Sequence, residues 1–188
     1  MELVSEAIVF AAKAHDGMRR KKSEAPYILH PMEAAVIVGT MTDDQHLIAA
    51  AALHDVVEDT GVTIEEIEEK FGKRVRELVQ AETEDKREEL PPSATWRIRK
   101  EDSLKELKNA EDIAVLMVWL GDKLANMRAI YHTWKVEGDA MWEKFNQKNV
   151  SEQAWYYRSI LRLTERLSDT SAWLEYKALT ELVFGKGD

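Results

Sequence analysis

The sequence predicts an all-α fold, and three observations support this prediction. Apolar residues recur at the three- and four-residue spacing of helices almost throughout the 188 residues. Glycine and proline number only 8 and 4, so few positions interrupt a helix. No stretch alternates apolar and polar residues over the length of a convincing β-strand. The expected architecture is a helical bundle of about eight to nine helices in a single domain, residues 1–188.

Composition narrows the class of protein. The formal net charge of −9 argues against nucleic-acid binding over a broad surface, which needs a basic face, but allows a small anionic ligand in a locally basic pocket. Cysteine is absent, which excludes disulfides and thiolate metal sites. The sequence contains no apolar run of eighteen or more residues, so no membrane-spanning helix is predicted. The N-terminus lacks a signal-peptide pattern. A cytoplasmic protein is expected, with homo-oligomer formation left open.

The N-terminal part predicts two helices joined by a basic loop. A first helix is expected over 2–15, ending at Asp16-Gly17. The loop over 18–29 then carries the densest cationic cluster of the chain: Arg19, Arg20, Lys21 and Lys22. His30-Pro31 is expected to open the second helix, with the proline in the first helical position, where its missing N–H does no harm.

A third helix is expected over about 44–58, ending before Gly61. Its C-terminal end carries four ionisable side chains: His54, Asp55, Glu58 and Asp59. Residues four apart share a helix face, so His54 is expected to stack with Glu58. Asp55 pairs in the same way with Asp59. Because such groups cost much free energy when buried without partners, their position at the end of an apolar helix indicates a divalent metal.

The remaining helices are predicted at about 63–72, 75–83, 96–108, 112–135, 151–167 and 171–184. Thr63 and Glu66 form a capping-box pattern at the start of the first of these, and Gly72 is expected to end it. The charged segment 84–93 contains Pro91-Pro92 and is expected to be a loop. The helix over 112–135 is the longest and most apolar, yet it carries Asp122, Lys123, Asn126 and Arg128.

A candidate metal-binding set consists of two imidazoles and two carboxylates: His30, His54, Asp55 and Asp122. Such a set, without sulfur, suits Mn²⁺, Fe²⁺ or Mg²⁺ better than a closed structural zinc site. Four protein ligands also leave coordination positions open for water, which a hydrolase requires. Sequence spacing by itself does not bring His30 and Asp122 to the other two residues.

The motifs that carry these residues are His30-Pro31, Leu53-His54-Asp55, Glu58-Asp59-Thr60 and the segment from Gly121 to Arg128. Together they resemble the HD superfamily of metal-dependent phosphohydrolases. More narrowly, they resemble the hydrolase domain of the RelA/SpoT alarmone enzymes and the single-domain small alarmone hydrolases. The resemblance covers about residues 5–130, and the helices over about 135–185 are expected to pack on this core.

The resemblance implies a role for each matching residue. The four candidate ligands would hold one Mn²⁺, with Fe²⁺ or Mg²⁺ as alternatives. Glu58 and Asp59 match the acidic pair that activates the attacking water or manages the leaving-group proton. The residues implied in substrate binding are Arg20, Lys21, Tyr27, Lys86 and Asn126, while Arg97 and Lys100 are weaker candidates for contacting phosphate.

The reaction implied is hydrolysis of the 3′-pyrophosphate of (p)ppGpp, releasing pyrophosphate and GDP or GTP. Ala129 stands where the alarmone enzymes often have threonine, so an HD phosphohydrolase acting on an adenine alarmone, NADPH or a nucleoside monophosphate is an alternative. A second alternative is a non-catalytic nucleotide-binding helical module. Against it, a protein that only binds a polyanion would have no use for the Glu58 and Asp59 carboxylates, which repel phosphate. The C-terminal tryptophans and tyrosines are expected to be core or subunit contacts rather than a ligand cage.

Overall fold

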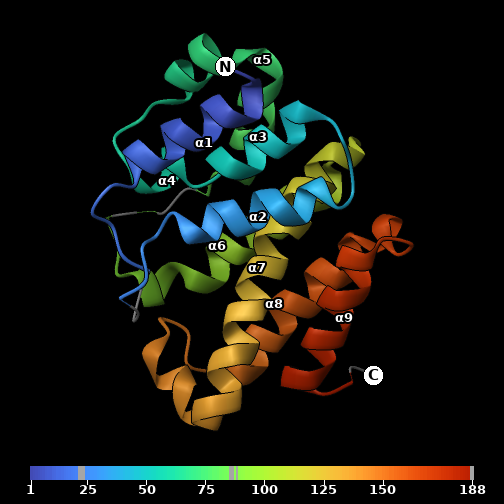
Figure 1. Cartoon of the computed structure of the whole chain (residues 1–188). Helices are drawn as coiled ribbons and strands as arrows, with labels where there is room; N and C mark the ends of the chain where they lie inside the picture. Colours follow the sequence, from blue (N-terminus) through green and yellow to red (C-terminus); the bar gives the residue numbers. More distant parts are fainter. Residues whose placement is uncertain (21–23, 85–86, 88, 187–188) are drawn as a thin grey trace.

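The computed structural model describes residues 1–20, 24–84, 87 and 89–186, and within them the chain is helical almost throughout (Figure 1). Its helices are α1 (Leu3–Ala14), α2 (Leu29–Gly39), α3 (Gln45–Leu53), α4 (Val56–Asp59), α5 (Ile64–Glu82), α6 (Pro92–Asn109), α7 (Ile113–Glu137), α8 (Val150–Leu163) and α9 (Ser171–Phe184), with 3-10 helices η1 (Gly138–Lys144) and η2 (Glu165–Leu167). β-Pairing in the described residues is limited to one bridge, between Arg19 and Pro26. The predicted all-α fold is confirmed.

Helix α7 runs through the middle of the molecule and separates two hydrophobic clusters (Figure 1). It contacts α2, α3, α5 and α9. Ala114 and Val118 belong to the cluster formed with α1, α3 and α5, whereas Leu116 and Leu120 belong to the cluster formed with α6, α8 and α9. The second cluster includes the buried aromatic residues Trp142, Tyr156 and Tyr157, as expected for core positions. In the described part of the chain, no helix has the length and apolar character of a membrane span.

Small residues let the helices that carry the candidate ligands approach closely. In α3, Ala49 to Leu53 are all buried, which places this helix against α1 and α2. In α7, a Cβ atom at Gly121 would lie 2.7 Å from Val38 Cγ2 and 3.0 Å from the carbonyl oxygen of Ala34 in α2. Glycine at this position therefore sets the distance between α2 and α7, and hence between His30 and Asp122.

We expect the Gly121→Ala variant to be destabilised by about 1–3 kcal/mol, because the added methyl group overlaps the backbone of α2. Urea unfolding measures this loss. Gly39→Ala is the matched control, since its Cβ would meet only Ile48 Cδ1 at 3.8 Å. That control is expected to be neutral or stabilised by about 0.4–1 kcal/mol. A Gly121→Ala variant as stable as the wild type would contradict the close contact of α2 and α7.

The expected helix signals are mostly confirmed. Asp44 accepts a hydrogen bond from the His46 N–H at 2.9 Å and caps α3. The capping box at the start of α5 is formed, with Glu66 N donating to Thr63 Oγ1 and Thr63 N donating to a Glu66 carboxylate oxygen. Gly72 interrupts α5 with φ of 84°, in the left-handed region that favours glycine. The prediction of two helices that meet at Gly72 is therefore confirmed, and α5 consists of these two helices joined at a kink.

Several boundaries differ from the prediction. Helix α6 begins at Pro92, inside the segment expected to be a loop. The helix expected over 44–58 is divided after Leu53, although His54 and Asp55 keep right-handed helical dihedral angles. At this division, His54 Nδ1 lies 2.8 Å from the Ala51 carbonyl oxygen. Helix α2 begins at Leu29 rather than at the proline, so Pro31 is its third residue. This position is still tolerated, since the first four N–H groups of a helix have no partner within it.

Candidate metal centre and its cavity

Four side chains from separate parts of the chain converge on one point. His30 comes from α2, His54 and Asp55 from the break between α3 and α4, and Asp122 from α7. His30 Nε2 lies 2.9 Å from Asp122 Oδ1 and 3.5 Å from Asp55 Oδ2. His54 Nε2 lies 3.2 Å from Asp55 Oδ2 and 3.5 Å from Asp122 Oδ1. The structure thus brings together all four residues predicted as ligands.

The donor atoms are oriented as a metal would require. Ligand atoms of His30, His54 and Asp122 all lie within 4.8 Å of one another. His54 Nδ1 is held by the Ala51 carbonyl, which directs Nε2 toward the carboxylates. That Nε2 atom is buried and forms no well-directed hydrogen bond. A nitrogen buried in this way fits a metal ligand, so the residues present can hold a divalent ion.

Electrostatics favours positive charge at this point. Burial opposes the ionised form of Asp122, yet Lys123 and both histidines hold the pKa of this carboxyl well below its usual range. Burial also acts against Asp55, whose pKa is nevertheless lowered by His54. Both carboxylates are therefore ionised at neutral pH, in the form that binds a cation.

Tyr27 connects the candidate ligands to the acidic pair. Its hydroxyl lies 2.8 Å from Asp55 Oδ2 and 2.5 Å from Asp59 Oδ2. Burial and these two carboxylates raise the pKa of Tyr27 well above its usual value, so the phenol stays protonated. The ring stacks on buried His15, with centroids 4.9 Å apart. The hydroxyl therefore fixes the position of Asp59 relative to Asp55.

A cavity of about 850 Å³ extends from this centre. Its wall includes the candidate ligands His30, Asp55 and Asp122 together with Glu58 and Asp59. The predicted binding residues Arg20, Tyr27 and Asn126 also line it, as do Ala129 and the aromatic residues Trp96, Trp119, Tyr156 and Tyr157. Arg20 donates a hydrogen bond to Asn126 Oδ1 at 3.0 Å, and Asn126 Nδ2 donates to Asp122 Oδ1 at 2.7 Å.

Sequence reasoning missed a group of ion pairs on another part of the wall. Lys123 forms ion pairs with Asp122 and with buried Glu82. Burial raises the pKa of Glu82 to about 8 despite the attraction of Lys123. Glu84 forms ion pairs with two cations of α6, Arg99 and Lys100. The available sequence signal was Lys123 itself, a charge inside the most apolar helix.

Other predicted residues are placed elsewhere. Lys21 and Lys86 lie outside the described residues. Arg97 is on the surface of α6, where it forms ion pairs with Glu101 and Glu152 and does not line the cavity. Arg128 also has a structural setting, because it joins α7 to Glu175 of α9 and Glu33 of α2.

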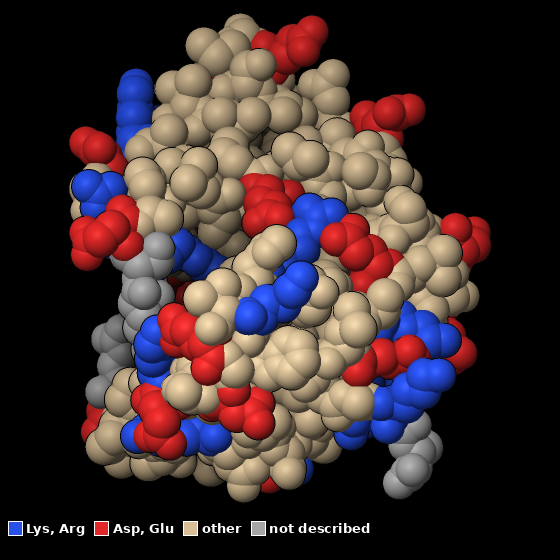
Figure 2. All heavy atoms as spheres, turned by 60° about the horizontal axis from the view of Figure 1, so that its bottom comes forward, with Lys and Arg blue, Asp and Glu red and all other residues tan. Residues whose placement is uncertain are grey.

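On the face that Figure 2 displays, basic and acidic side chains intermingle over the surface. The cations that line the cavity in the described part of the chain are Arg19, Arg20, Arg99, Lys100, Lys123 and Lys144. The same wall carries seven carboxylates, and four of these cations form ion pairs with them: Arg99, Lys100, Lys123 and Lys144. The cavity thus places cations beside acidic groups, and such cations can pair with phosphate groups of a small anionic ligand.

Comparison with known proteins gives one matching family model, described as HD domain, over residues 7–147. A GTP pyrophosphokinase from Myxococcus xanthus is 35% identical over 134 residues, which are 70% of this chain and 18% of the relative. A probable guanosine-3′,5′-bis(diphosphate) 3′-pyrophosphohydrolase from Synechocystis sp. is 40% identical over 129 residues, which are 68% of this chain and 17% of the relative. The chain thus spans less than a fifth of the length of these relatives.

Solved structures show the same fold. A metazoan ortholog of SpoT, described as hydrolysing ppGpp, matches with a TM-score of 0.77 over 99% of this chain and 98% of its own, at 23% identity. The lmo0812 protein of Listeria monocytogenes matches with a TM-score of 0.72 over 84% of this chain and 99% of its own, at 27% identity. Both similarities extend the shared architecture beyond the residues that the sequence motifs occupy.

Proposed function

This chain belongs to the HD-domain family, and we propose that it is a metal-dependent phosphohydrolase that removes the 3′-pyrophosphate of (p)ppGpp with Mn²⁺ as its metal. The observation that carries the proposal is the cluster of His30, His54, Asp55 and Asp122 beside a cavity that also contains an acidic pair and several cations. The Synechocystis relative bears the name of this reaction, whereas the Myxococcus relative bears that of the synthetic one. The site favours hydrolysis, because it contains carboxylates that can accept a proton from water.

In this proposal, the four ligands hold one divalent ion. A bound ion of this kind would lower the pKa of a water molecule and neutralise negative charge on the oxygens of the attacked phosphoryl group. Asp122 is kept ionised by Lys123, and Asn126 Nδ2 donates to its Oδ1 at 2.7 Å. These neighbours hold the ligand oxygen in place, which is the usual task of residues around a metal site.

Glu58 and Asp59 supply the proton acceptors. Asp59 is held at 2.5 Å by the Tyr27 hydroxyl, and Glu58 Oε2 accepts a hydrogen bond from the backbone N–H of Glu84 at 3.3 Å. Both carboxylates line the cavity beside the ligands. One of them takes the proton of the attacking water, and the other handles the proton of the leaving group. No nucleophilic side chain is required, so no covalent intermediate is expected.

The nucleotide end of the substrate is assigned to Arg20 and Asn126, which are joined by a 3.0 Å hydrogen bond. The Arg20 guanidinium lies 5.6 Å from the centroid of the Tyr27 ring, which leaves its plane able to stack on a base. Lys21 and Lys86 are proposed to contact phosphate on the basis of the sequence resemblance. Arg20 and Asn126 are linked to the proposed metal ligand Asp122 by the hydrogen bond from Asn126.

Ala129 favours a second candidate substrate class. It lines the cavity one turn before Thr133, at a position that offers no side-chain hydrogen bond to a base. An HD phosphohydrolase acting on an adenine alarmone, NADPH or a nucleoside monophosphate would use the same metal centre. The alternative of a non-catalytic binder is opposed by Glu58 and Asp59, since each carboxylate repels a polyanion.

The proposal predicts pyrophosphate release from ppGpp that depends on Mn²⁺. Purified protein treated with EDTA should lose about a hundredfold or more of its activity, and restored Mn²⁺ should recover it, because the ion supplies the charge stabilisation. A parallel panel contains ppApp, NADPH and AMP. If the protein binds Mn²⁺ but leaves ppGpp intact, the alarmone assignment fails and the panel identifies the substrate class. If it binds no divalent ion, the metal centre itself is wrongly assigned.

A further inference from the structure

The carboxylate of Glu84 is held by three groups of α6. It forms an ion pair with Arg99, and its Oε2 lies 2.7 Å from Lys100 Nζ and 3.2 Å from Ser103 Oγ. These charged side chains are largely withdrawn from solvent, with exposed fractions of 10% for Glu84, 11% for Arg99 and 20% for Lys100. We call Arg99, Lys100 and Ser103 the α6 cradle. Two cations and a hydroxyl group therefore converge on one anion.

Burying these cations has an electrostatic cost. Burial lowers the pKa of Lys100 even though the Glu84 charge opposes this effect. Burial likewise works against Glu84, whose pKa is kept below its usual value by Lys100 and Arg99. Replacing a buried ion-pair network by apolar residues is often neutral or stabilising. A contribution to folding stability is therefore a weak explanation for the presence of this network. The same donors, an arginine fork, an ammonium and a hydroxyl, are those that proteins use to bind phosphate.

The α6 cradle belongs to the same cavity as the metal centre. Arg99, Lys100 and Ser103 line that cavity together with Asp55 and Asp122. The backbone N–H of Glu84 bonds the proton acceptor Glu58, so the anion in the cradle is next to the catalytic pair. A phosphate group in this position would be part of a ligand that also reaches the metal centre.

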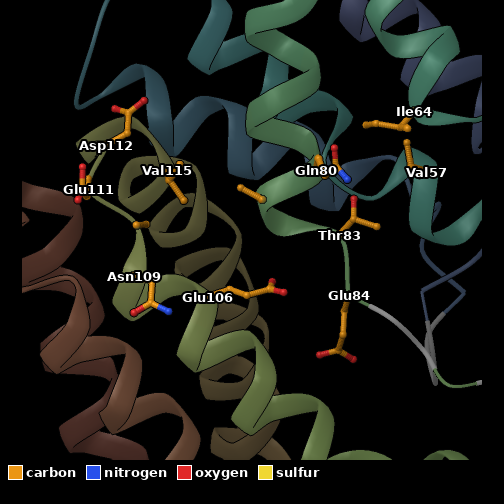
Figure 3. A pocket seen from close by; sticks show the side chains of 12 residues that line it. Val57, Ile64, Gln80, Thr83, Glu84, Glu106, Asn109, Glu111, Asp112 and Val115 are labelled. Atoms are coloured by element: carbon orange, nitrogen blue, oxygen red, sulfur yellow. The ribbon is translucent and has the colours of Figure 1, made fainter.

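Glu84 also lines a second hollow. Figure 3 shows it beside Thr83 on the segment that leaves α5, at the edge of this hollow of about 920 Å³. The hollow is lined by Gln80 and Asn109 and by the acidic residues Glu106, Glu111 and Asp112. Glu84 therefore lies at the boundary of two cavities, with its carboxylate in the α6 cradle.

We infer that the α6 cradle is a phosphate subsite, which Glu84 fills in the free protein and which a phosphate group of the ligand takes over on binding. The carboxylate acts as an internal competitor that keeps two cations compensated until the ligand arrives. The inference deepens the proposed function, since it assigns part of a polyphosphate substrate to named residues. Only the identity of the natural ligand rests on the proposed function. The subsite itself can be tested with inorganic pyrophosphate, which carries the same phosphate groups.

Titration calorimetry of pyrophosphate into the EDTA-treated full chain tests this inference without any hydrolysis. Glu84→Gln is expected to bind pyrophosphate about tenfold more tightly than wild type, because the competing charge is gone. Lys100→Met is expected to bind it about tenfold more weakly, because one donor of the cradle is lost. The matched controls are Glu77→Gln and Lys105→Met, which change exposed helical residues outside the cavity. Both controls should leave the Kd unchanged.

An unchanged Kd in either Glu84→Gln or Lys100→Met overturns the inference and leaves the ion pairs a structural feature. If Glu84→Gln does not fold, Ser103→Ala is tested beside Lys100→Met, because it is a small change to the α6 cradle. A wild-type Kd for pyrophosphate in both of these variants would also overturn the inference. The result is independent of the substrate assignment. A protein that shows the expected pyrophosphate affinities but leaves ppGpp intact would keep the subsite and lose the proposed reaction.

Discussion

Replacing His54 by alanine is expected to abolish both divalent-metal binding and hydrolysis. Its Nε2 atom is buried and faces Asp55 and Asp122 at 3.2 and 3.5 Å. Several kcal/mol of charge stabilisation disappear with the ion, so activity should fall by roughly a thousandfold or more. Asp122→Asn should behave in the same way, because it removes the charge that joins both histidines.

Thermal unfolding separates loss of metal from loss of folding. At a Mn²⁺ concentration about 100 times its Kd, binding stabilises the native state by roughly 2.7 kcal/mol. For a chain of this size that corresponds to a rise in Tm of about 5–10 °C. Wild type should show this rise, and His54→Ala should unfold cooperatively without it. His46→Ala, with a side chain 51% exposed, is the control and should retain the full response. A metal-dependent Tm in His54→Ala would show that the ion binds elsewhere.

The sequence predicted the helices and the ligand set for different reasons. Helical periodicity and caps are local, so elements such as α5 with its Thr63–Glu66 capping box could be located from the chain. The convergence of His30 with Asp122 is not local. It depends on Gly121 bringing α2 and α7 together, and only the resemblance to HD phosphohydrolases indicated that these residues share a site.

Three features of the site had no signal in the spacing of residues. The contact of the His54 imidazole with the Ala51 carbonyl, where α3 and α4 are divided, is not revealed by periodicity. Tyr27 lies at the pocket wall, as expected, but nothing in the sequence indicated that its hydroxyl contacts Asp55 and Asp59. The pairing of Glu84 with Lys100 likewise joins α6 to the segment after α5, which sequence reasoning treated as a charged loop.

The second large effect is expected from the acidic pair. Glu58→Gln and Asp59→Asn should each lower kcat by about 10²–10⁴, the usual contribution of a positioned acid or base. The substitutions preserve size, so the cavity and the contact between residue 59 and the Tyr27 hydroxyl should persist. Because the four metal ligands are unchanged, both variants should keep the Mn²⁺-dependent rise in Tm. KM should stay the same or fall, since each substitution removes a charge that repels phosphate.

This combination of results distinguishes proton transfer from a structural role. A variant that lost kcat through misfolding would also lose the Tm response, whereas a variant that lost only its proton acceptor would not. Glu65→Gln, an exposed residue of α5, is the matched control and should retain wild-type kcat. The binder hypothesis makes the opposite prediction for the pair: wild type would turn over no nucleotide, and Glu58→Ala with Asp59→Ala would bind it as before. Wild-type kcat in both single variants would remove the acidic pair from the mechanism, because two proton acceptors beside the metal cannot both be dispensable.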